Sequence, residues 1–241
     1  MESNFGIYEY RVSFERLNEI LDTNDNSFSE VNEIPSRTQL TFTNGFYVNC
    51  SALMIDIRDS SKLIDSHKRP TLSKLYRSYI SEVVAVINGN TNCSEINIIG
   101  DGILGIFNTP LKNEIDNLIS TSAQLSSLMK TLNYKLVKGN ISEIQVGIGI
   151  DYGRALMIKA GHKGSTINDV VWIGDVINQA VHLSDHGNAS YNDKEIMISN
   201  VIYNNLNDYN KSLFSLNLNR GCYHGNIFNS DMEAWYVENC K

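Results

Sequence analysis

Two aspartates in this sequence stand where an apolar strand gives way to a polar bend. Asp56 ends the apolar run of "SALMIDIRDSS", and Asp101 lies between two glycines in "NIIGDGILGIF". If these strands are neighbours in a sheet, the two carboxylates come within roughly 5 Å, the spacing of cross-strand pairs. Two like charges at that distance need a counter-charge, and hard oxygen ligands suit Mg²⁺ or Mn²⁺. The pattern therefore predicts a site for divalent cations.

Such a site points to phosphoryl transfer. Two divalent ions about 4 Å apart can activate one hydroxyl and stabilise a leaving phosphate. The bend at residues 58–61 would offer backbone N–H groups and the hydroxyls of Ser60 and Ser61 to a polyphosphate. Each motif alone has an ordinary explanation, because aspartate often caps a helix and Gly-Asp-Gly is a common turn. Their joint placement favours the metal site.

The bulk composition excludes several other classes of protein. The chain has 241 residues, 42% of them hydrophobic, and a net charge of −7, so it can bury a core but attracts neither nucleic acid nor an anionic membrane. No apolar run approaches the length of a membrane span, and the N-terminus has no apolar signal region. The four cysteines lack CxxC spacing. We therefore expect a cytoplasmic protein with reduced thiols.

The elements that must position the aspartates follow from periodicity. Residues 1–45 are predicted to be an N-terminal arm, polar and aperiodic after a short helix at 14–21, and residues 46–241 a single domain. Apolar steps of three and four residues predict a helix from Pro70 to Ile87. The order of elements favours an α+β fold with helices on one face of a sheet. The other expected elements are strands in "FYVNCSALMID", "INII", "ILGIF", "SEIQVGIGID", "RALMIKAG" and "KEIMIS", helices at 111–132, in "GDVINQAVHLSD" and at 201–206, and a last strand in "MEAWYV", with a turn at 152–153.

Four segments resemble, in order and spacing, the signature segments of class III nucleotide cyclases: "MIDIRDSS", "NIIGDGILGIF", "VGIGIDYGRALMIKAG" and "VWIGDVINQAVHL". The resemblance covers residues 46–238, with "MEAWYV" similar to the closing strand of the family. It implies a ferredoxin-like catalytic domain with an antiparallel-rich sheet, which converts a nucleoside triphosphate to a 3′,5′-cyclic nucleotide and pyrophosphate. Within the family, the chain most resembles the bacterial pyrimidine cyclases of Pycsar anti-phage defence.

The resemblance assigns roles to the residues around the two aspartates. It implies that Asp56 and Asp101 hold two Mg²⁺ or Mn²⁺ ions, with the Ile57 carbonyl completing the set of ligands. The residues implied to wrap the β- and γ-phosphates are Arg58, Asp59, Ser60 and Ser61. The family works as a homodimer with each site between protomers, so each site would be completed by the partner copy.

Two positions, His182 and His224, depart from the family pattern. Asn178 matches the asparagine that orients the ribose from the other protomer. Four residues later on the same helical face, His182 stands where the family carries an arginine. Histidine can donate a hydrogen bond but lacks the permanent charge and forked donors of arginine. His182 is therefore either a substitute for that arginine or an idle exposed residue. His224-Gly225 falls near a phosphate-binding Lys-Gly of the family, although the loop lengths do not fit.

Base choice rests on Asn97 and Val171, because neither the adenylate pattern nor the guanylate pattern of residues is met at these positions. The Asn97 amide can serve a uracil or a cytosine edge, since it offers donors and an acceptor. Val171 is either a passive pocket wall or ordinary core packing. The prediction is thus a cyclase of UTP or CTP, producing cUMP or cCMP as a second messenger for a separate effector, in which the ribose 3′-oxygen attacks the α-phosphorus.

Three alternatives stay open at this point. The first is an adenylate or guanylate cyclase with an atypical base pocket. The second is a catalytically inactive module that binds a nucleotide, favoured only by the replacement at His182. The third is the palm fold of diguanylate cyclases, which shares the two-aspartate logic but has a GGDEF-like hairpin tip. The tip here, Gly100-Asp101-Gly102-Ile103, does not match it.

Overall fold

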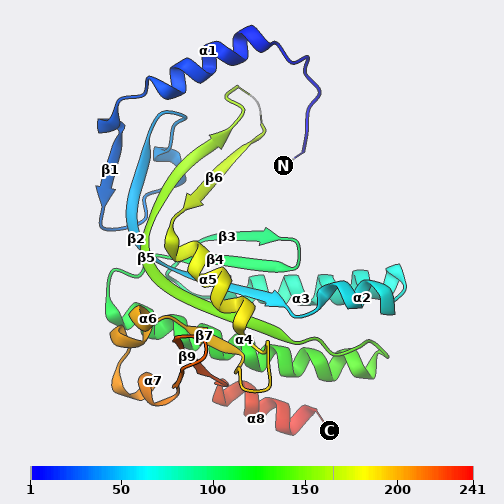
Figure 1. Cartoon of the computed structure of the whole chain (residues 1–241). Helices are drawn as coiled ribbons and strands as arrows, with labels where there is room; N and C mark the ends of the chain where they lie inside the picture. The colour runs from blue at the N-terminus through cyan, green and yellow to red at the C-terminus, as the bar shows by residue number, and fades with distance from the viewer. Residues whose placement is uncertain (1, 165, 241) are drawn as a thin grey trace.

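Two long antiparallel strands, β2 (Gly45–Ile57) and β5 (Val146–Gly161), form the centre of the fold. The computed structural model describes residues 2–164 and 166–240. The register pairs Gly45 with Ile158 at one end of β2 and Ile57 with Val146 at the other. The main path of the sheet runs β3-β4-β2-β5-β7-β9-β8, with β1 paired to β2 and β6 paired to β5 (Figure 1). Most pairs are antiparallel, as expected for this α+β fold.

The remaining elements follow in chain order. The strands are β1 (Phe28–Val31), β3 (Cys93–Ile99), β4 (Gly102–Phe107), β6 (Asn168–Ile173), β7 (Ile196–Ile198), β8 (Ser215–Asn217) and β9 (Cys222–Gly225). The helices are α1 (Tyr10–Leu21), α2 (Ser60–Ser66), α3 (Arg69–Asn88), α4 (Lys112–Lys138), α5 (Asp175–His186), α6 (Asn200–Asn205), α7 (Asp208–Ser212) and α8 (Ser230–Asn239), with 3₁₀ turns η1 (Asp25–Ser27) and η2 (Arg37–Gln39). Among the described residues, no helix is long and apolar enough to cross a bilayer.

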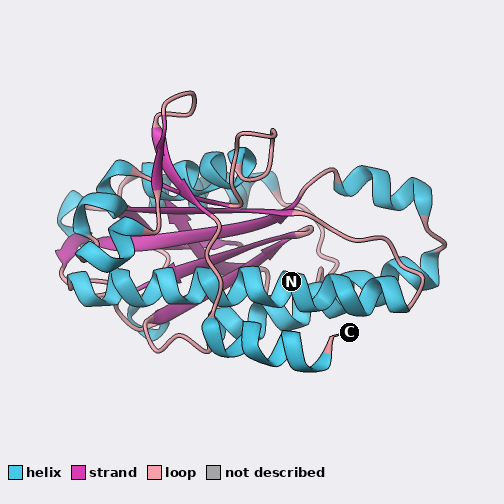
Figure 2. Ribbon diagram, turned by 90° about the horizontal axis from the view of Figure 1, so that it is seen from below, coloured by secondary structure: helices cyan, strands magenta, loops and turns pink. Residues whose placement is uncertain are grey.

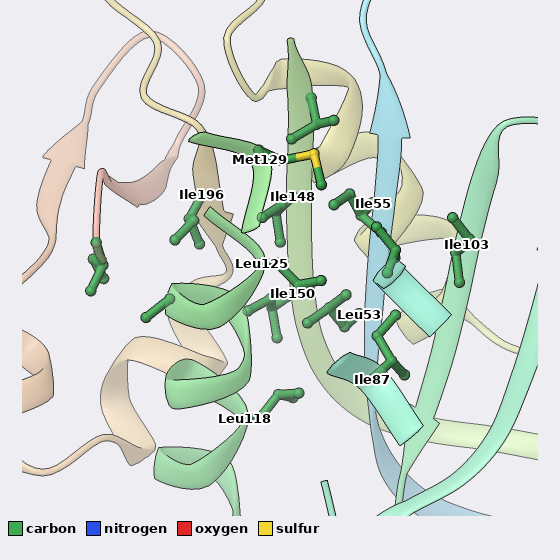
Figure 3. Close-up of a cluster of buried hydrophobic side chains, with 14 of the residues drawn as sticks. Leu53, Ile55, Ile87, Ile103, Leu118, Leu125, Met129, Ile148, Ile150 and Ile196 are labelled. Carbon is green, nitrogen blue, oxygen red and sulfur yellow. The ribbon is translucent and has the colours of Figure 1, made fainter. Parts of the chain in front are cut away.

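The sheet has helices on both faces, whereas the sequence predicted them on one (Figure 2). Alternation along β2 sends Leu53 and Ile55 to a large core shared with α3 and α4 (Figure 3). The alternate residues Ala52 and Met54 point to the opposite face and lie in a second core, which includes Val176 and other residues of α5. Asp56 continues this second series, so the face of the sheet that carries α5 also carries the metal-site candidate.

Several predicted elements are confirmed. The long apolar helix runs through Arg69–Asn88 with proline at its first turn, and β3 and β4 form the predicted hairpin, its tip turning at Gly100 with φ +66°. The helix predicted at 111–132 is confirmed as α4 but extends to Lys138. α5 ends before Gly187, as its sequence indicated.

The turn predicted at residues 152–153 is wrong. β5 passes straight through it, because Tyr152 and Gly153 pair with Ser51 and Cys50 of β2 and so keep an extended backbone. The chain reverses later, and β6, which the sequence analysis did not identify, returns along the far end of β5. In Figure 1, β5 curves away from the main sheet and carries β6 with it.

The last predicted strand, "MEAWYV", is also wrong. These residues lie in α8, whose first turn is capped by the Asn229 side chain accepting a hydrogen bond from the Met232 N–H. Glu233 of α8 accepts a hydrogen bond from Lys130 of α4, so the helix is fixed on the helical layer. The sequence predicted a closing strand like that of the family it resembles, but the cap and the contact with α4 favour a helix.

Part of the predicted N-terminal arm is integrated into the sheet. β1 pairs in parallel with the start of β2, from Phe28 opposite Gly45 to Val31 opposite Val48. Leu40 is buried in the core beneath α5, and the Ile34 N–H donates to the Asn108 side chain. By contrast, none of the residues of α1 is buried.

Close packing of α5 on β5 gives the first prediction. A Cβ added at Gly149 would lie 2.1 Å from the Ala180 carbonyl oxygen of α5, whereas one at Gly153 would meet nothing nearer than 3.4 Å, an ordinary contact. We expect Gly149→Ala to lower the free energy of unfolding by about 1–3 kcal/mol, since the helix must move off the strand. The matched control Gly153→Ala should change it little. Urea unfolding followed by tryptophan fluorescence measures both, and equal midpoints would contradict this account of the packing.

Candidate metal and nucleotide site

Asp56 and Asp101 are brought together by the hairpin register. Ile55 is paired with Ile103 of β4, so the next residue of β2, Asp56, reaches the level of Gly102 and the hairpin tip. A Cβ built on Gly102 would lie 2.3 Å from the Met54 side chain and 3.3 Å from an Asp56 carboxylate oxygen. Glycine at this position therefore lets the tip, with Asp101, approach the end of β2.

The electrostatics of the pair are those of two carboxylates sharing one site. Burial raises the pKa of the Asp56 carboxyl, and the nearby charge of Asp101 raises it further. The Ile57 N–H, which donates to the Asp56 carboxylate, opposes these effects, as does the charge of Arg58. The pKa of the Tyr79 hydroxyl on α3 is raised by burial and by both aspartates, so it lies within electrostatic reach of both.

These residues fit a divalent cation. Asp101 has a buried carboxylate oxygen without a hydrogen-bond partner, and the hydroxyl of the fully buried Tyr79, on which both aspartates act electrostatically, is unpartnered too. A bound cation would satisfy that carboxylate oxygen and remove the repulsion between the two acids. Within the described residues no cluster of three or more acidic, histidine or cysteine ligands exists.

The loop after Asp56 lies at the C-terminal end of α5. The Arg58 guanidinium donates to the carbonyl oxygens of Ser184 and Asp185, 3.3 and 3.0 Å away, and so stabilises the negative end of that helix. Its side chain is thus engaged within the protomer. Asp59 takes a left-handed backbone conformation, φ +53°, and pairs with exposed Lys62. The chain turns sharply there and begins α2.

The positions of the other loop residues are consistent with access to a ligand. Ser60 and Ser61 are the first two residues of α2, and Ser61 is exposed. Ile57 is different, because its side chain is buried in the core between the sheet and α3. Only its backbone is available at the end of β2.

Asn178 and His182 lie on the outer face of α5. Both are exposed, one helical turn apart, whereas Val176 and Ala180 are buried against the sheet. Arg58 attaches the aspartate loop to the C-terminal end of the same helix. Both side chains point away from their own core and are accessible to a ligand or a second chain.

The two positions for base choice are on different strands. Asn97 lies opposite Leu104, which is buried beneath α5, so its amide is on the α5 face of the sheet. Val171 of β6 lies opposite Ile158 of β5. Its side chain is 38% exposed, whereas its neighbours Val170 and Trp172 are buried. Val171 is therefore not a core residue.

His224 is separated from the aspartates. It lies in β9, with β7 and β5 between it and β2 in the sheet. The ring is buried, and its Nδ1 accepts from the Lys194 N–H at 3.3 Å and contacts the Asn217 amide at 3.1 Å. Burial and the charge of Lys194 lower its pKa. Within one protomer the structure does not bring this histidine to the carboxylate pair.

Sequence reasoning missed two groups beside the site. Tyr79 lies within the helix predicted from Pro70 to Ile87, at a position of its apolar face, and nothing in the pattern distinguishes it from an ordinary core ring. Glu95 left a detectable signal, because it is a carboxylate two residues before Asn97 on the same face of a strand. It is almost completely buried and pairs with Arg37, a residue that the sequence analysis had placed in the arm.

Comparison with known proteins connects this geometry to a family. The family described as "Adenylate and Guanylate cyclase catalytic domain" matches residues 44–238. A protein of Treponema porcinum named uridylate cyclase is 37% identical over 229 residues, which cover 95% of this chain and 76% of the relative. A uridylate cyclase of Gulbenkiania mobilis is 37% identical over 216 residues, 87% of this chain and 83% of the relative. The solved adenylyl cyclase CyaB from P. aeruginosa superposes with a TM-score of 0.61 at 21% identity, covering 71% of this chain and 85% of that one.

The raised pKa of Asp56 gives a prediction for how the stability of the metal-free protein depends on pH. Its folded pKa lies above the unfolded value, so a penalty on folding develops as the pH rises above the unfolded pKa and is complete above the folded pKa, whereas it is absent below the unfolded pKa. Without metal, Asp56→Asn should therefore be at least as stable as wild type at pH 8, and that advantage should disappear near pH 3. Thermal unfolding at the two pH values measures this.

The same variant should lose stabilisation by Mn²⁺. Wild type should gain about 2.7 kcal/mol when the free ion is at a hundred times its Kd, because only the folded chain presents the site. Asp56→Asn should gain much less, and Asp65→Asn, which changes an exposed carboxylate of α2, should respond like wild type. An unchanged Mn²⁺ response in Asp56→Asn would exclude Asp56 as a ligand.

Proposed function

Since the chain belongs to the adenylate and guanylate cyclase catalytic domain family, and so is a nucleotide cyclase, we propose that it is a uridylate cyclase. It converts UTP to 3′,5′-cyclic UMP and pyrophosphate. The observation that carries this choice of base is the 37% identity, over most of the chain, to two proteins named uridylate cyclase. The absence of both purine patterns at Asn97 and Val171 supports it.

Asp56 and Asp101 would hold two Mg²⁺ or Mn²⁺ ions, with the Ile57 carbonyl as a further ligand. Ions bound there supply positive charge that lowers the pKa of a ribose hydroxyl and neutralises a triphosphate. The orphaned Asp101 oxygen and the raised pKa of Asp56 support this assignment.

The remaining work of the chain is to position the nucleotide. The ribose 3′-oxygen attacks the α-phosphorus, its proton is released, and pyrophosphate leaves. This reaction needs little covalent participation from side chains, so alignment of the reacting atoms provides much of the rate. Ser60, Ser61 and the backbone of residues 58–61 would hold the departing phosphates at the start of α2. Arg58 would keep that loop against α5, because its guanidinium is already bonded there.

We assign Asn178 and His182 to the site of the partner protomer in a homodimer. Both are exposed on α5 and point away from their own core, which supports an action across an interface. Asn178 would orient the ribose through its amide. His182 would donate a hydrogen bond to the phosphate in the place of an arginine.

Product identification tests the proposed reaction. Wild type incubated with Mn²⁺ and each of the four ribonucleoside triphosphates should form cyclic UMP from UTP at the highest kcat/KM, and Asp56→Asn and Asp101→Asn should form none. Asn178→Ala should lower kcat by about 10²–10³-fold, the usual loss for one transition-state contact. Chromatography with mass detection identifies the product. Asp65→Asn is the control, with wild-type turnover expected.

Each other outcome selects an alternative. Preferential turnover of ATP or GTP would indicate a purine cyclase with an atypical pocket. Nucleotide binding without pyrophosphate release from any triphosphate would indicate an inactive binding module.

Mixing variants tests the shared site. If Asp56 and Asn178 serve one site from different protomers, a heterodimer of Asp56→Asn and Asn178→Ala has one intact and one doubly damaged site. Equal mixing of the two inactive variants should therefore restore about a quarter of wild-type activity, because half the dimers are mixed and each has one working site. A mixture no more active than its parents would place both residues in the same protomer's site.

The cellular role follows from the resemblance to Pycsar cyclases. We propose that cyclic UMP leaves the enzyme as a second messenger read by a separate effector in anti-phage defence. This role requires cyclic UMP to rise in producing cells upon phage infection, and a constant level would exclude it.

A further inference from the structure

Arg37 links two strands that are not neighbours in the sheet. Its Nε donates to a Glu95 carboxylate oxygen of β3 at 2.9 Å, and one of its terminal nitrogens donates to the other oxygen. The second terminal nitrogen lies 3.4 Å from a carboxylate oxygen of Asp169 in β6. β3 and β6 are separated in the sheet by β4, β2 and β5, and the guanidinium contacts a carboxylate of each.

The two carboxylates that Arg37 contacts, Glu95 and Asp169, each lie two residues before a base-choice position. Glu95 precedes Asn97 by two residues on β3, and Asp169 precedes Val171 by two residues on β6. Residues two apart in a strand share a face. Arg37 therefore contacts, on each strand, the residue two positions before a base-choice position, although it is sixty residues before Asn97 in the chain.

The backbone that carries Arg37 is fixed. It begins the 3₁₀ turn η2, whose first turn is capped by the Ser36 hydroxyl accepting from the Thr38 N–H. Leu40, just after this turn, is buried in the core beneath α5. The arginine side chain is 53% exposed while that of Glu95 is 5% exposed, so the guanidinium keeps N–H donors accessible to a ligand beside its contacts with Glu95 and Asp169.

We propose that Arg37 is a specificity-determining residue at the base end of the site, where its free N–H donors select uracil over cytosine. This rests on the proposed function, since it names a residue that reads the base of the same substrate. Uracil presents carbonyl oxygens at positions 2 and 4, which accept from a guanidinium. Cytosine carries an amine at position 4, and arginine has no acceptor for it. A donor facing a donor leaves both without partners when water is excluded, which disfavours cytosine.

The neighbouring groups complete this discrimination. Glu95 is a buried carboxylate that would otherwise attract the cytosine amine, and Arg37 occupies both of its oxygens. The Asn97 amide, on the same strand face, can accept from the uracil N3–H. Arg37 thus acts in two ways, because it adds donors and removes the acceptor that would favour the wrong base.

The test is the ratio of kcat/KM for UTP to that for CTP, measured by product chromatography. Arg37→Met should lower this ratio at least tenfold, and Arg37→Lys, which keeps the charge but not the fork, should lower it less. The matched control is Arg154→Met, because Arg154 also joins the N-terminal segment to the sheet, through Glu30, but its side chain is exposed and it belongs to β5 rather than to either base-choice strand. Its ratio should equal that of wild type.

A second variant separates specificity from folding. Arg37→Met leaves Glu95 buried without its partner and can lose stability for that reason, so Arg37→Met with Glu95→Gln removes the unpaired charge. The double variant should keep a reduced ratio at wild-type thermal stability, and it decides the question if the single variant does not fold. Recovery of the wild-type ratio in the double variant would mean that Arg37 acts only through structure, and the proposal would be wrong.

Failure of this inference is distinguishable from failure of the proposed function. A wild type that forms no cyclic UMP, or prefers another triphosphate, overturns the proposed function and the uracil role of Arg37 together. A wild type that prefers UTP, with the same preference in Arg37→Met, overturns the role of Arg37 alone.

Discussion

The approach of two like-charged carboxylates at one end of the sheet is the constraint on which the rest of the structure depends. Asp56 and Asp101 are held together by the pairing of β2 with β4 and by a glycine that admits the hairpin tip. Burial makes this pairing unfavourable for the isolated chain, as the raised pKa of Asp56 indicates. In the proposed function a divalent cation would remove this repulsion, and the remaining elements would form the surroundings in which a nucleotide meets that cation.

The two faces of the sheet divide these tasks. α3 and α4 bury one face in a continuous apolar core, which makes the central strands rigid. The other face carries α5, and glycines along β5 let the helix backbone lie almost in contact with the strand. Side chains on the outer face of α5 therefore do not pack in the core of their own protomer. This arrangement exposes Asn178 and His182 on the same side of the sheet as the aspartate pair.

The N-terminal segment is part of the folded domain, because it adds a strand, a core residue and an ion pair to it. β1 extends the sheet, Leu40 enters the core beneath α5, and Arg37 pairs with a carboxylate that the sheet has buried. A buried carboxylate is costly unless it is paired, so this segment and the strand that carries Asn97 are energetically coupled. The described position of Arg37 is what connects the arm to the question of base choice.

The sequence alone determined the local features. Apolar periodicity predicted α3, α4, α5 and the β3–β4 hairpin, because each depends on contacts a few residues apart, and the spacing of the aspartates predicted their role as a metal site, which stays a prediction. The sequence could not determine the path of β5, which looks interrupted at Tyr152-Gly153 but is kept extended by its pairing with β2. It also could not determine that "MEAWYV" is helical, because that depends on the Asn229 cap and on the contact with α4. Nor could it place Arg37 beside Glu95 and Asp169, or show that Arg58 binds the end of α5. Those contacts join residues 58 to 132 positions apart, and only the folded sheet brings them together.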